Sequence, residues 1–222
     1  MIIPIANLIS SDDLQTITHL IQDATFTDGK ETAGWHARDI KNNEQLLEGA
    51  QYEKISKTLS LTLQKNELFN IAAMPHVVRP FLISRSQNNG NYGPHVDNAI
   101  MTGRRTSRTD ISMTIFLSDP DSYDGGELVI EETAGERRFK LPAGFAVFYP
   151  STTLHRVEPV TKGARLVACT WVQSRIRDAA QREIVFDLDT ARRKIFEQDG
   201  KSREFDLLSK THANLIRMWA EV

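Results

Sequence analysis

The sequence predicts an α+β fold in which a β-rich middle segment lies between two helical ones. Apolar residues recur at helical spacing in the first third of the chain, and short β-rich runs separated by turn signals begin at about Val77. Helical spacing returns after Gln173. We therefore expect three regions: supporting helices at residues 1–76, a β core at 77–174, and a helical extension at 175–222.

Residues 1–76 are expected to pack helices against the core. Ser10 to Asp13 offer N-caps for a helix whose apolar residues are Leu14, Ile17, Leu20 and Ile21. A second segment with helical periodicity runs from about residue 44 to 68. The polar stretch between them, at residues 27–35, contains two glycines and reads as a loop with a short strand.

The middle region alternates β-rich runs with strong turn signals. The punctuating residues are Gly, Pro, Asn and Asp, as in Asp124-Gly125-Gly126. Many short strands at this spacing are typical of a barrel or a double-sheet jelly roll. The predicted strands are residues 78–84, 110–117, 127–131, 138–141, 145–149, 154–159 and 164–173.

The last region is expected to form two helices. Apolar positions three and four residues apart occur at 176–197 and again at 202–220, separated by Asp199-Gly200. These helices are candidates for a contact between two copies of the chain, so a homo-oligomer is one expectation.

Composition limits the class of protein. The 222 residues fit one domain with an appendage, and the formal net charge of −2 favours neither nucleic acid nor a membrane surface as a partner. Cys169 is the only cysteine, which excludes an intramolecular disulfide and a cysteine-based zinc site. The start of the chain does not read as a signal peptide, and no apolar run is long enough to span a bilayer. We expect a cytoplasmic protein.

One set of residues points to metal chemistry. His95 and Asp97 lie two residues apart where a strand is expected, so their side chains share a face. His155, on the predicted strand 154–159, is the candidate third ligand. Two histidines and a carboxylate form the facial triad of non-haem Fe(II) oxygenases. The ligand set alone does not exclude zinc or manganese.

Arg165 sharpens this interpretation. Residues 158–163 look like a turn centred near Val160, so a hairpin would make His155 and Arg165 cross-strand partners. A guanidinium held beside the metal suits a bidentate clamp on a carboxylate. 2-Oxoglutarate chelates iron at one end and offers a carboxylate at the other. The same parity puts Val167, Cys169 and Trp171 on this face, with Trp171 a candidate wall of the pocket.

At these residues the chain resembles the PKHD-type hydroxylases, a bacterial branch of the Fe(II)/2-oxoglutarate-dependent dioxygenases related to prolyl and lysyl hydroxylases. The matching segments are TAG at 32–34, KNN at 41–43, GPHVDNAI at 93–100, RTDIS at 108–112, YDGGELVI at 123–130, KLPAG at 140–144, LHRV at 154–157, PVTKGAR at 159–165 and WVQS at 171–174. They span most of the chain, and its helical end resembles the C-terminal extension of that family.

The resemblance implies a double-stranded β-helix (jelly-roll) dioxygenase core at 77–174. It also implies Fe(II) bound by His95, Asp97 and His155 as the catalytic centre, with 2-oxoglutarate bound through Arg165. 2-Oxoglutarate and O₂ are then the small-molecule co-substrates, and L-ascorbate is an auxiliary cofactor of such proteins. The implied activity is hydroxylation of a peptidyl prolyl or lysyl side chain or of a small metabolite, with release of succinate and CO₂.

One departure from the family pattern concerns the co-substrate. Many relatives carry an Asn-Arg-Tyr segment where this chain has Ser84-Arg85-Ser86, so the tyrosine expected near 2-oxoglutarate is absent. Tyr149 and Tyr92 are candidate substitutes, although Tyr92 would point away from His95 in a regular strand. Ser86 gives weight to a second hypothesis, a sensor that binds iron and 2-oxoglutarate without turnover. A third, a β module without metal, requires the triad to be scattered.

The remaining histidines have no partner at ligand spacing, and we expect ordinary roles for His19, His36, His76 and His212. The basic loop at 103–108 is a candidate for recognition of an acidic substrate, but a solvated loop is the simpler interpretation. Cys169 is expected to be a packing residue.

Overall fold

The computed structural model describes residues 1–32, 38–103 and 105–222. Ala33 and Gly34 of the TAG motif, His36, and Arg104 of the basic loop lie outside the described residues. Among the described residues, no helix is both long enough and apolar enough to cross a membrane.

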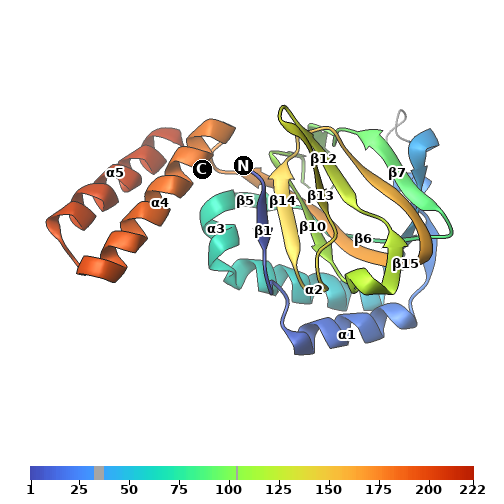
Figure 1. Cartoon of the computed structure of the whole chain (residues 1–222). Helices are drawn as coiled ribbons and strands as arrows, with labels where there is room; N and C mark the ends of the chain where they lie inside the picture. The colour runs from blue at the N-terminus through green and yellow to red at the C-terminus, as the bar shows by residue number, and fades with distance from the viewer. Residues whose placement is uncertain (33–37, 104) are drawn as a thin grey trace.

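The core consists of two antiparallel layers that share the long strand β15 (His155–Ser174), as Figure 1 shows. The first layer contains β1 (Ile3–Ile5), β14 (Ala146–Pro150), β10 (Ile111–Phe116), β15, β6 (Leu82–Gln87), β4 (Glu44–Leu46) and β2 (Phe26–Asp28), with β5 (Pro75–Val78) also on β15. The second layer contains β3 (Lys41–Asn42), β7 (Gly90–His95), β15, β12 (Leu128–Glu132), β13 (Gly135–Phe139) and β11 (Tyr123–Gly125). A small separate ribbon pairs β8 (Ile100–Met101) with β9 (Ser107–Arg108).

Three helices pack against the first layer: α1 (Ser11–Gln22), α2 (Ala50–Lys65) and α3 (Glu67–Ala73). The Ser10 side chain accepts a hydrogen bond from the Asp13 amide, so the predicted N-cap of α1 is present. Ile17 and Ile21 of α1 are buried in the main apolar core. Short 3₁₀ turns occur at Gly29–Thr32, Arg38–Ile40 and Pro120–Ser122.

A second apolar cluster fills the space between the two layers. It includes Phe116, Leu128, Ile130, Val147 and Val167, all at most 2% exposed. The α+β class predicted from the pattern is thus confirmed, with a jelly-roll core of two facing sheets.

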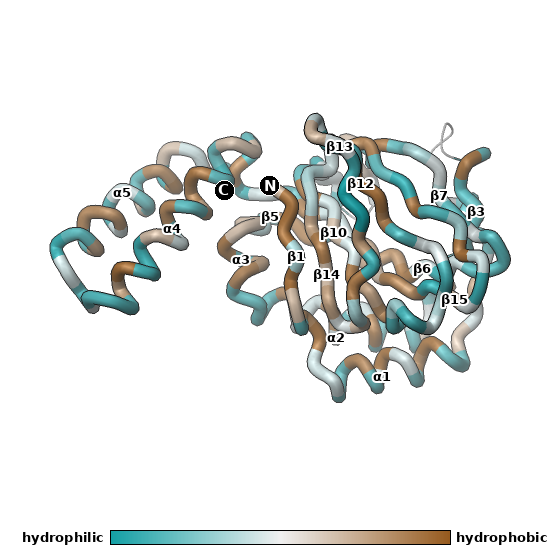
Figure 2. The backbone as a smooth tube through the Cα atoms, in the orientation of Figure 1, coloured by the Kyte–Doolittle hydropathy of each residue, from teal (hydrophilic) through white to brown (hydrophobic). Residues whose placement is uncertain are grey.

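The chain ends in two antiparallel helices, α4 (Ala179–Asp199) and α5 (Arg203–Trp219), which extend away from the β core (Figure 1). Hydrophobic and hydrophilic stretches alternate along both (Figure 2). Arg193 of α4 joins Asp189 to Glu67 of α3 and so ties the extension to the supporting helices. The proposed division at residues 77 and 175 stays a prediction.

The expected helix at 44–68 is wrong at its start. Glu44–Leu46 form strand β4, which pairs with β6, and α2 begins only at Ala50. Gln45 and Leu46 are buried by this pairing. A short apolar run does not by itself distinguish a buried strand from a helix. Here residues 44–46 form a strand because they pair with β6.

The expected hairpin at 158–163 is also wrong. β15 runs without a break through Val160, and its pairing shifts register at this point against both β7 and β11. Gly163 has φ +71° and continues the strand. Because both edges of this part of β15 are occupied by other strands, its turn residues produce a bend and bulges in place of a reversal.

We expect Gly163→Ala to destabilise the protein strongly. A Cβ at residue 163 would lie 2.2 Å from the carbonyl oxygen of Ser122, and the backbone is left-handed. Strain and overpacking together predict a loss of about 3 kcal/mol in the free energy of unfolding, measured by urea denaturation.

The matched control is Gly200→Ala. Gly200 has nearly the same φ, +67°, but nothing lies within 4 Å of its added Cβ. Its ψ is −146°, so a loss of about 1–2 kcal/mol is expected from the backbone alone. Equal losses in the two variants would contradict the close packing of β11 against β15.

Candidate metal centre

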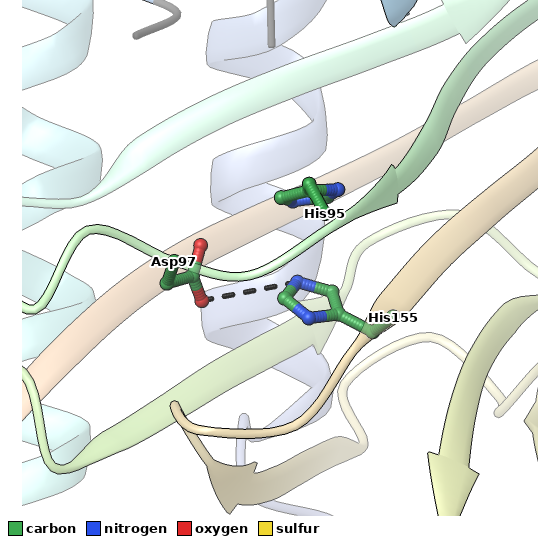
Figure 3. Close-up of side chains that lie close together, drawn as sticks. All are labelled: His95, Asp97 and His155. Atoms are coloured by element: carbon green, nitrogen blue, oxygen red, sulfur yellow. Dashed lines mark ion pairs between the residues drawn. The ribbon is translucent and has the colours of Figure 1, made fainter. Parts of the chain in front are cut away.

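The fold brings His95, Asp97 and His155 together. His95 ends β7, His155 begins β15, and the two residues are partners in the antiparallel pairing. One candidate ligand atom of each of the three side chains lies within 4.8 Å of the others. Figure 3 shows Asp97 and His155 pointing toward each other, with 3.8 Å between Asp97 Oδ2 and His155 Nε2. Residues far apart in sequence therefore offer two imidazoles and a carboxylate to one point.

Backbone carbonyls orient both imidazoles. His95 Nδ1 lies 2.8 Å from the carbonyl oxygen of Gly93, and His155 Nδ1 lies 3.1 Å from that of Thr153. A carbonyl oxygen can only accept, so Nδ1 must carry the proton in each ring. The Nε2 lone pair of each neutral ring is then free to bind a metal.

The surroundings of His95 favour this neutral form. Burial, and next the charge of His155, lower the pKa of His95 to about 4. Its ring stacks on Tyr92, with the ring centroids 3.6 Å apart and an angle of 16° between the planes. At neutral pH His95 is therefore an uncharged nitrogen donor held in a fixed plane.

The expectation that Tyr92 points away from His95 is wrong, because β7 is not regular. His155 and Val157 of β15 pair with His95 and Tyr92 of β7. Between these two pairs, Gly93 and Pro94 of β7 thus oppose the single residue Arg156 of β15, which is a β-bulge. The extra residue brings Tyr92 and His95 to the same face. Pro94, which has no N–H to donate to the ladder, lies inside this bulge.

Arg165 faces the same cavity as the triad. Its side chain is only 3% exposed, and in the described part of the chain no carboxylate pairs with it. Its Nε has no hydrogen-bond partner, and its guanidinium carbon lies 5.6 Å from the centre of the Phe116 ring. Burial lowers the pKa of Arg165 from its ordinary value. A buried cation with no carboxylate partner among the described residues is costly, and this one is positioned to receive an anionic ligand.

The predicted face of β15 lines the cavity, although by a different route from the expected hairpin. Arg165, Val167, Cys169 and Trp171 all contribute, together with His155. They share parity along a single bent strand. Trp171 is thus a wall of the pocket, as expected, and burial raises the pKa of the Cys169 thiol, in keeping with a packing role.

The serine at the position of the expected tyrosine lies beside β15. Ser86 of β6 lies opposite Arg165 and is buried in the cavity wall. Tyr149 also lines the cavity, with its ring centroid 5.1 Å from that of His155. Both tyrosines that were candidate substitutes for the absent one therefore border the site.

Sequence reasoning missed Lys41, a second cation in the cavity wall. Lys41 of β3 pairs with Tyr92 of β7, and its Nζ lies 5.3 Å from the centre of the Tyr92 ring. The side chain is buried, and burial lowers the pKa of Lys41 to about 8. The KNN motif was the available signal, but no spacing rule relates it to the triad.

The residues expected to be ordinary lie elsewhere. His19 is exposed on α1, His76 contacts Arg105, and His212 lies 3.6 Å from Asp189. Arg108 of the basic loop makes two hydrogen bonds to Asp110 and one to Glu221. The part of this loop that the structure describes therefore contributes an internal ion pair.

Two family profiles match parts of this chain, and relatives match all of it. Residues 81–173 match the profile of the 2OG-Fe(II) oxygenase superfamily, and residues 179–221 match that of the PKHD-type hydroxylase C-terminal domain. A PKHD-type hydroxylase of Synechococcus sp. (strain JA-2-3B'a(2-13)) is 51% identical over 224 residues, and one of Crocosphaera subtropica is 50% identical over 222 residues. Both matches cover all of this chain and all of the relative.

Solved structures share the fold at low sequence identity. A prolyl-4-hydroxylase of Pseudomonas putida has a TM-score of 0.54 and 15% identity, covering 78% of this chain and 92% of its own. A viral collagen prolyl hydroxylase from Paramecium Bursaria Chlorella virus-1, solved with 2OG, has a TM-score of 0.54 and 17% identity, covering 78% and 96%.

The charge of Arg165, which no carboxylate of the described residues neutralises, predicts a conflict between the stability of the ligand-free protein and ligand binding. We expect Arg165→Met to stabilise the ligand-free protein by about 1–3 kcal/mol, because an apolar side chain of similar length avoids the cost of burying a lone cation. Urea denaturation in metal-free buffer measures this.

Arg108→Met provides the contrast. Arg108 is paired with the nearly buried Asp110, at 2.7 Å, so its loss leaves a carboxylate without its partner and is expected to cost about 2 kcal/mol. A destabilised Arg165→Met variant would contradict the view that this guanidinium is kept for ligand binding.

Proposed function

The chain belongs to the PKHD-type hydroxylases, and we propose that it is an Fe(II)- and 2-oxoglutarate-dependent dioxygenase that releases succinate and CO₂ as it hydroxylates its substrate. One observation carries the proposal: the three candidate ligands and the buried guanidinium of Arg165 line a single cavity. The triad would hold the iron, and the guanidinium would hold the carboxylate of the co-substrate.

The donor set fits ferrous iron. His95 and His155 each present an Nε2 lone pair, and Asp97 presents a carboxylate oxygen. This is the donor set of a facial triad, which leaves coordination positions for other ligands. When bound, iron and 2-oxoglutarate supply the oxidative chemistry, in which one oxygen atom of O₂ enters the substrate as hydroxyl and the other enters succinate.

Arg165 has the role of co-substrate anchor in this proposal. Its guanidinium can donate two parallel hydrogen bonds to the distal carboxylate of 2-oxoglutarate. That carboxylate would neutralise a charge for which the described residues offer no counterion. Tyr92, Tyr149 and Trp171 border the same space, and their rings limit the entry of water.

The substrate candidates are a peptidyl prolyl or lysyl side chain and a small metabolite. Two of the solved structures with this fold are named prolyl hydroxylases, which supports the first candidate. The proposal also includes L-ascorbate as an auxiliary cofactor, a cytoplasmic location, no nucleic-acid or membrane partner, and contact between copies through α4 and α5. A lone cysteine accords with a reducing compartment.

Anaerobic titration tests the co-substrate site. Adding Fe(II) and then 2-oxoglutarate is expected to produce the visible charge-transfer band of the chelate. Arg165→Met is expected to weaken 2-oxoglutarate binding by about thirtyfold or more, because a buried charge partner is lost. Arg137→Met, which removes a half-exposed guanidinium on β13, is the matched control.

Exposure of the loaded protein to air then separates enzyme from sensor. Succinate formed without added substrate is expected from a dioxygenase, whereas a stable chelate that makes no succinate would favour the sensor. Absence of the band in the wild-type protein would contradict both.

Asp97→Ala tests the metal ligands. Loss of the only carboxylate in the triad is expected to reduce bound iron to a small fraction of one equivalent, measured by dialysis against Fe(II) under argon and metal analysis. The control is Asp121→Ala, since Asp121 is an exposed residue. Unchanged iron stoichiometry in a folded Asp97→Ala protein would contradict the assignment.

A further inference from the structure

A chain of two buried hydroxyl groups ends on the carboxylate of the triad. Ser112 Oγ lies 2.5 Å from Asp97 Oδ2, and Ser151 Oγ lies 2.7 Å from Ser112 Oγ. Both serines are at most 3% exposed. Nothing in the sequence pattern singled out either residue for this role.

The direction of each bond follows from the chemistry of the groups. An ionised carboxylate can only accept, so the Ser112 hydroxyl donates to Asp97. A serine has one hydroxyl hydrogen, and that of Ser112 is thereby used. The Ser151 hydroxyl must therefore donate to Ser112, which makes Ser112 a stronger donor in turn.

The hydrogen bond from Ser112 goes to the carboxylate oxygen of Asp97 that faces His155. Asp97 Oδ2 is the atom that lies 3.8 Å from His155 Nε2, so the hydroxyl chain holds the oxygen that faces the other ligand. A carboxylate attached through rotatable bonds has several orientations, and a hydrogen bond to one oxygen selects among them. Groups behind a metal ligand commonly set its orientation in this way.

Both hydroxyls are mounted on rigid backbone. Ser112 lies on β10, where it is paired with Tyr149 of β14 on one side and with Trp171 of β15 on the other. The amide of Ser151 donates to the carbonyl oxygen of Asp110, which fixes the turn after β14. The two hydroxyl groups are thus held in place before any ligand binds.

We propose that Ser112 and Ser151 are positioning residues that hold the Asp97 carboxylate ready for metal binding, with Ser112 in contact and Ser151 behind it. This inference rests on the proposed function. It extends the site from three side chains to five and assigns part of the metal affinity to residues that do not touch the ion.

The test measures metal affinity in the full-length protein without turnover. Mn(II) serves as the probe because its unbound form is quantified directly by electron paramagnetic resonance. Ser112→Ala is expected to raise the Kd for Mn(II) by about 10–100-fold. Ser151→Ala is expected to raise it by less than about tenfold, because the bond from Ser112 to Asp97 persists.

Two further variants separate positioning from packing. Ser112→Thr keeps the hydroxyl and is expected to recover most of the affinity lost in Ser112→Ala. Ser84→Ala removes a buried hydroxyl from the same cavity wall, one that accepts a hydrogen bond from Asn43 and does not contact the triad. It is expected to leave the Kd for Mn(II) within about twofold of wild type.

The outcomes distinguish the inference from the proposed function. If wild type itself binds no Mn(II) or Fe(II), the proposed function fails. If wild type binds and folded Ser112→Ala binds equally well, the inference is overturned. Should Ser112→Ala not fold, Ser151→Ala decides: a weakened Kd supports the hydroxyl chain, and an unchanged Kd overturns it.

Discussion

The arrangement of the site depends on one strand, β15, which is paired on both edges and belongs to both layers of the core. At its first residue, His155, it faces β7 and the rest of the triad. At Arg165 it has crossed into the other layer and lies opposite β6. Because residues of one parity face the same side of a strand, a single bent strand brings both a candidate metal ligand and a buried guanidinium to one cavity.

Burying charged side chains in the cavity wall costs free energy of folding. Arg165 and Lys41 are both removed from solvent in the cavity wall, and burial lowers the pKa of each. For Arg165, which pairs with no carboxylate among the described residues, such burial opposes folding unless an anion is present. A protein that binds a metal and a dicarboxylate recovers this cost when its ligands arrive, since ligands that bind only the folded state stabilise it. A bound anion beside Arg165 would therefore stabilise the folded protein.

The helical extension is fastened close to the site. The amide of Glu221 donates to the carbonyl oxygen of Arg175, directly after β15, and the Glu221 carboxylate accepts from Arg108. Arg108 in turn holds Asp110, whose backbone carbonyl fixes Ser151. A continuous set of hydrogen bonds thus links the end of the chain to the hydroxyl groups behind Asp97. Among the described residues, the helical extension and the triad are therefore connected by the same series of hydrogen bonds.

The sequence by itself determined the class of fold, the helices at both ends, and the four residues that converge, because periodicity and residue chemistry are local properties. It also identified Ser86, which the structure puts opposite Arg165. Only the tertiary structure decided how they converge. The turn-like residues around Val160 bend a continuous strand because both its edges are already paired, and an extra residue in β7 turns Tyr92 toward His95. The roles of Ser112, Ser151 and Lys41 could not be predicted, although two of them lie in motifs noted in the sequence. These roles depend on which strands are neighbours, and the sequence pattern does not specify that.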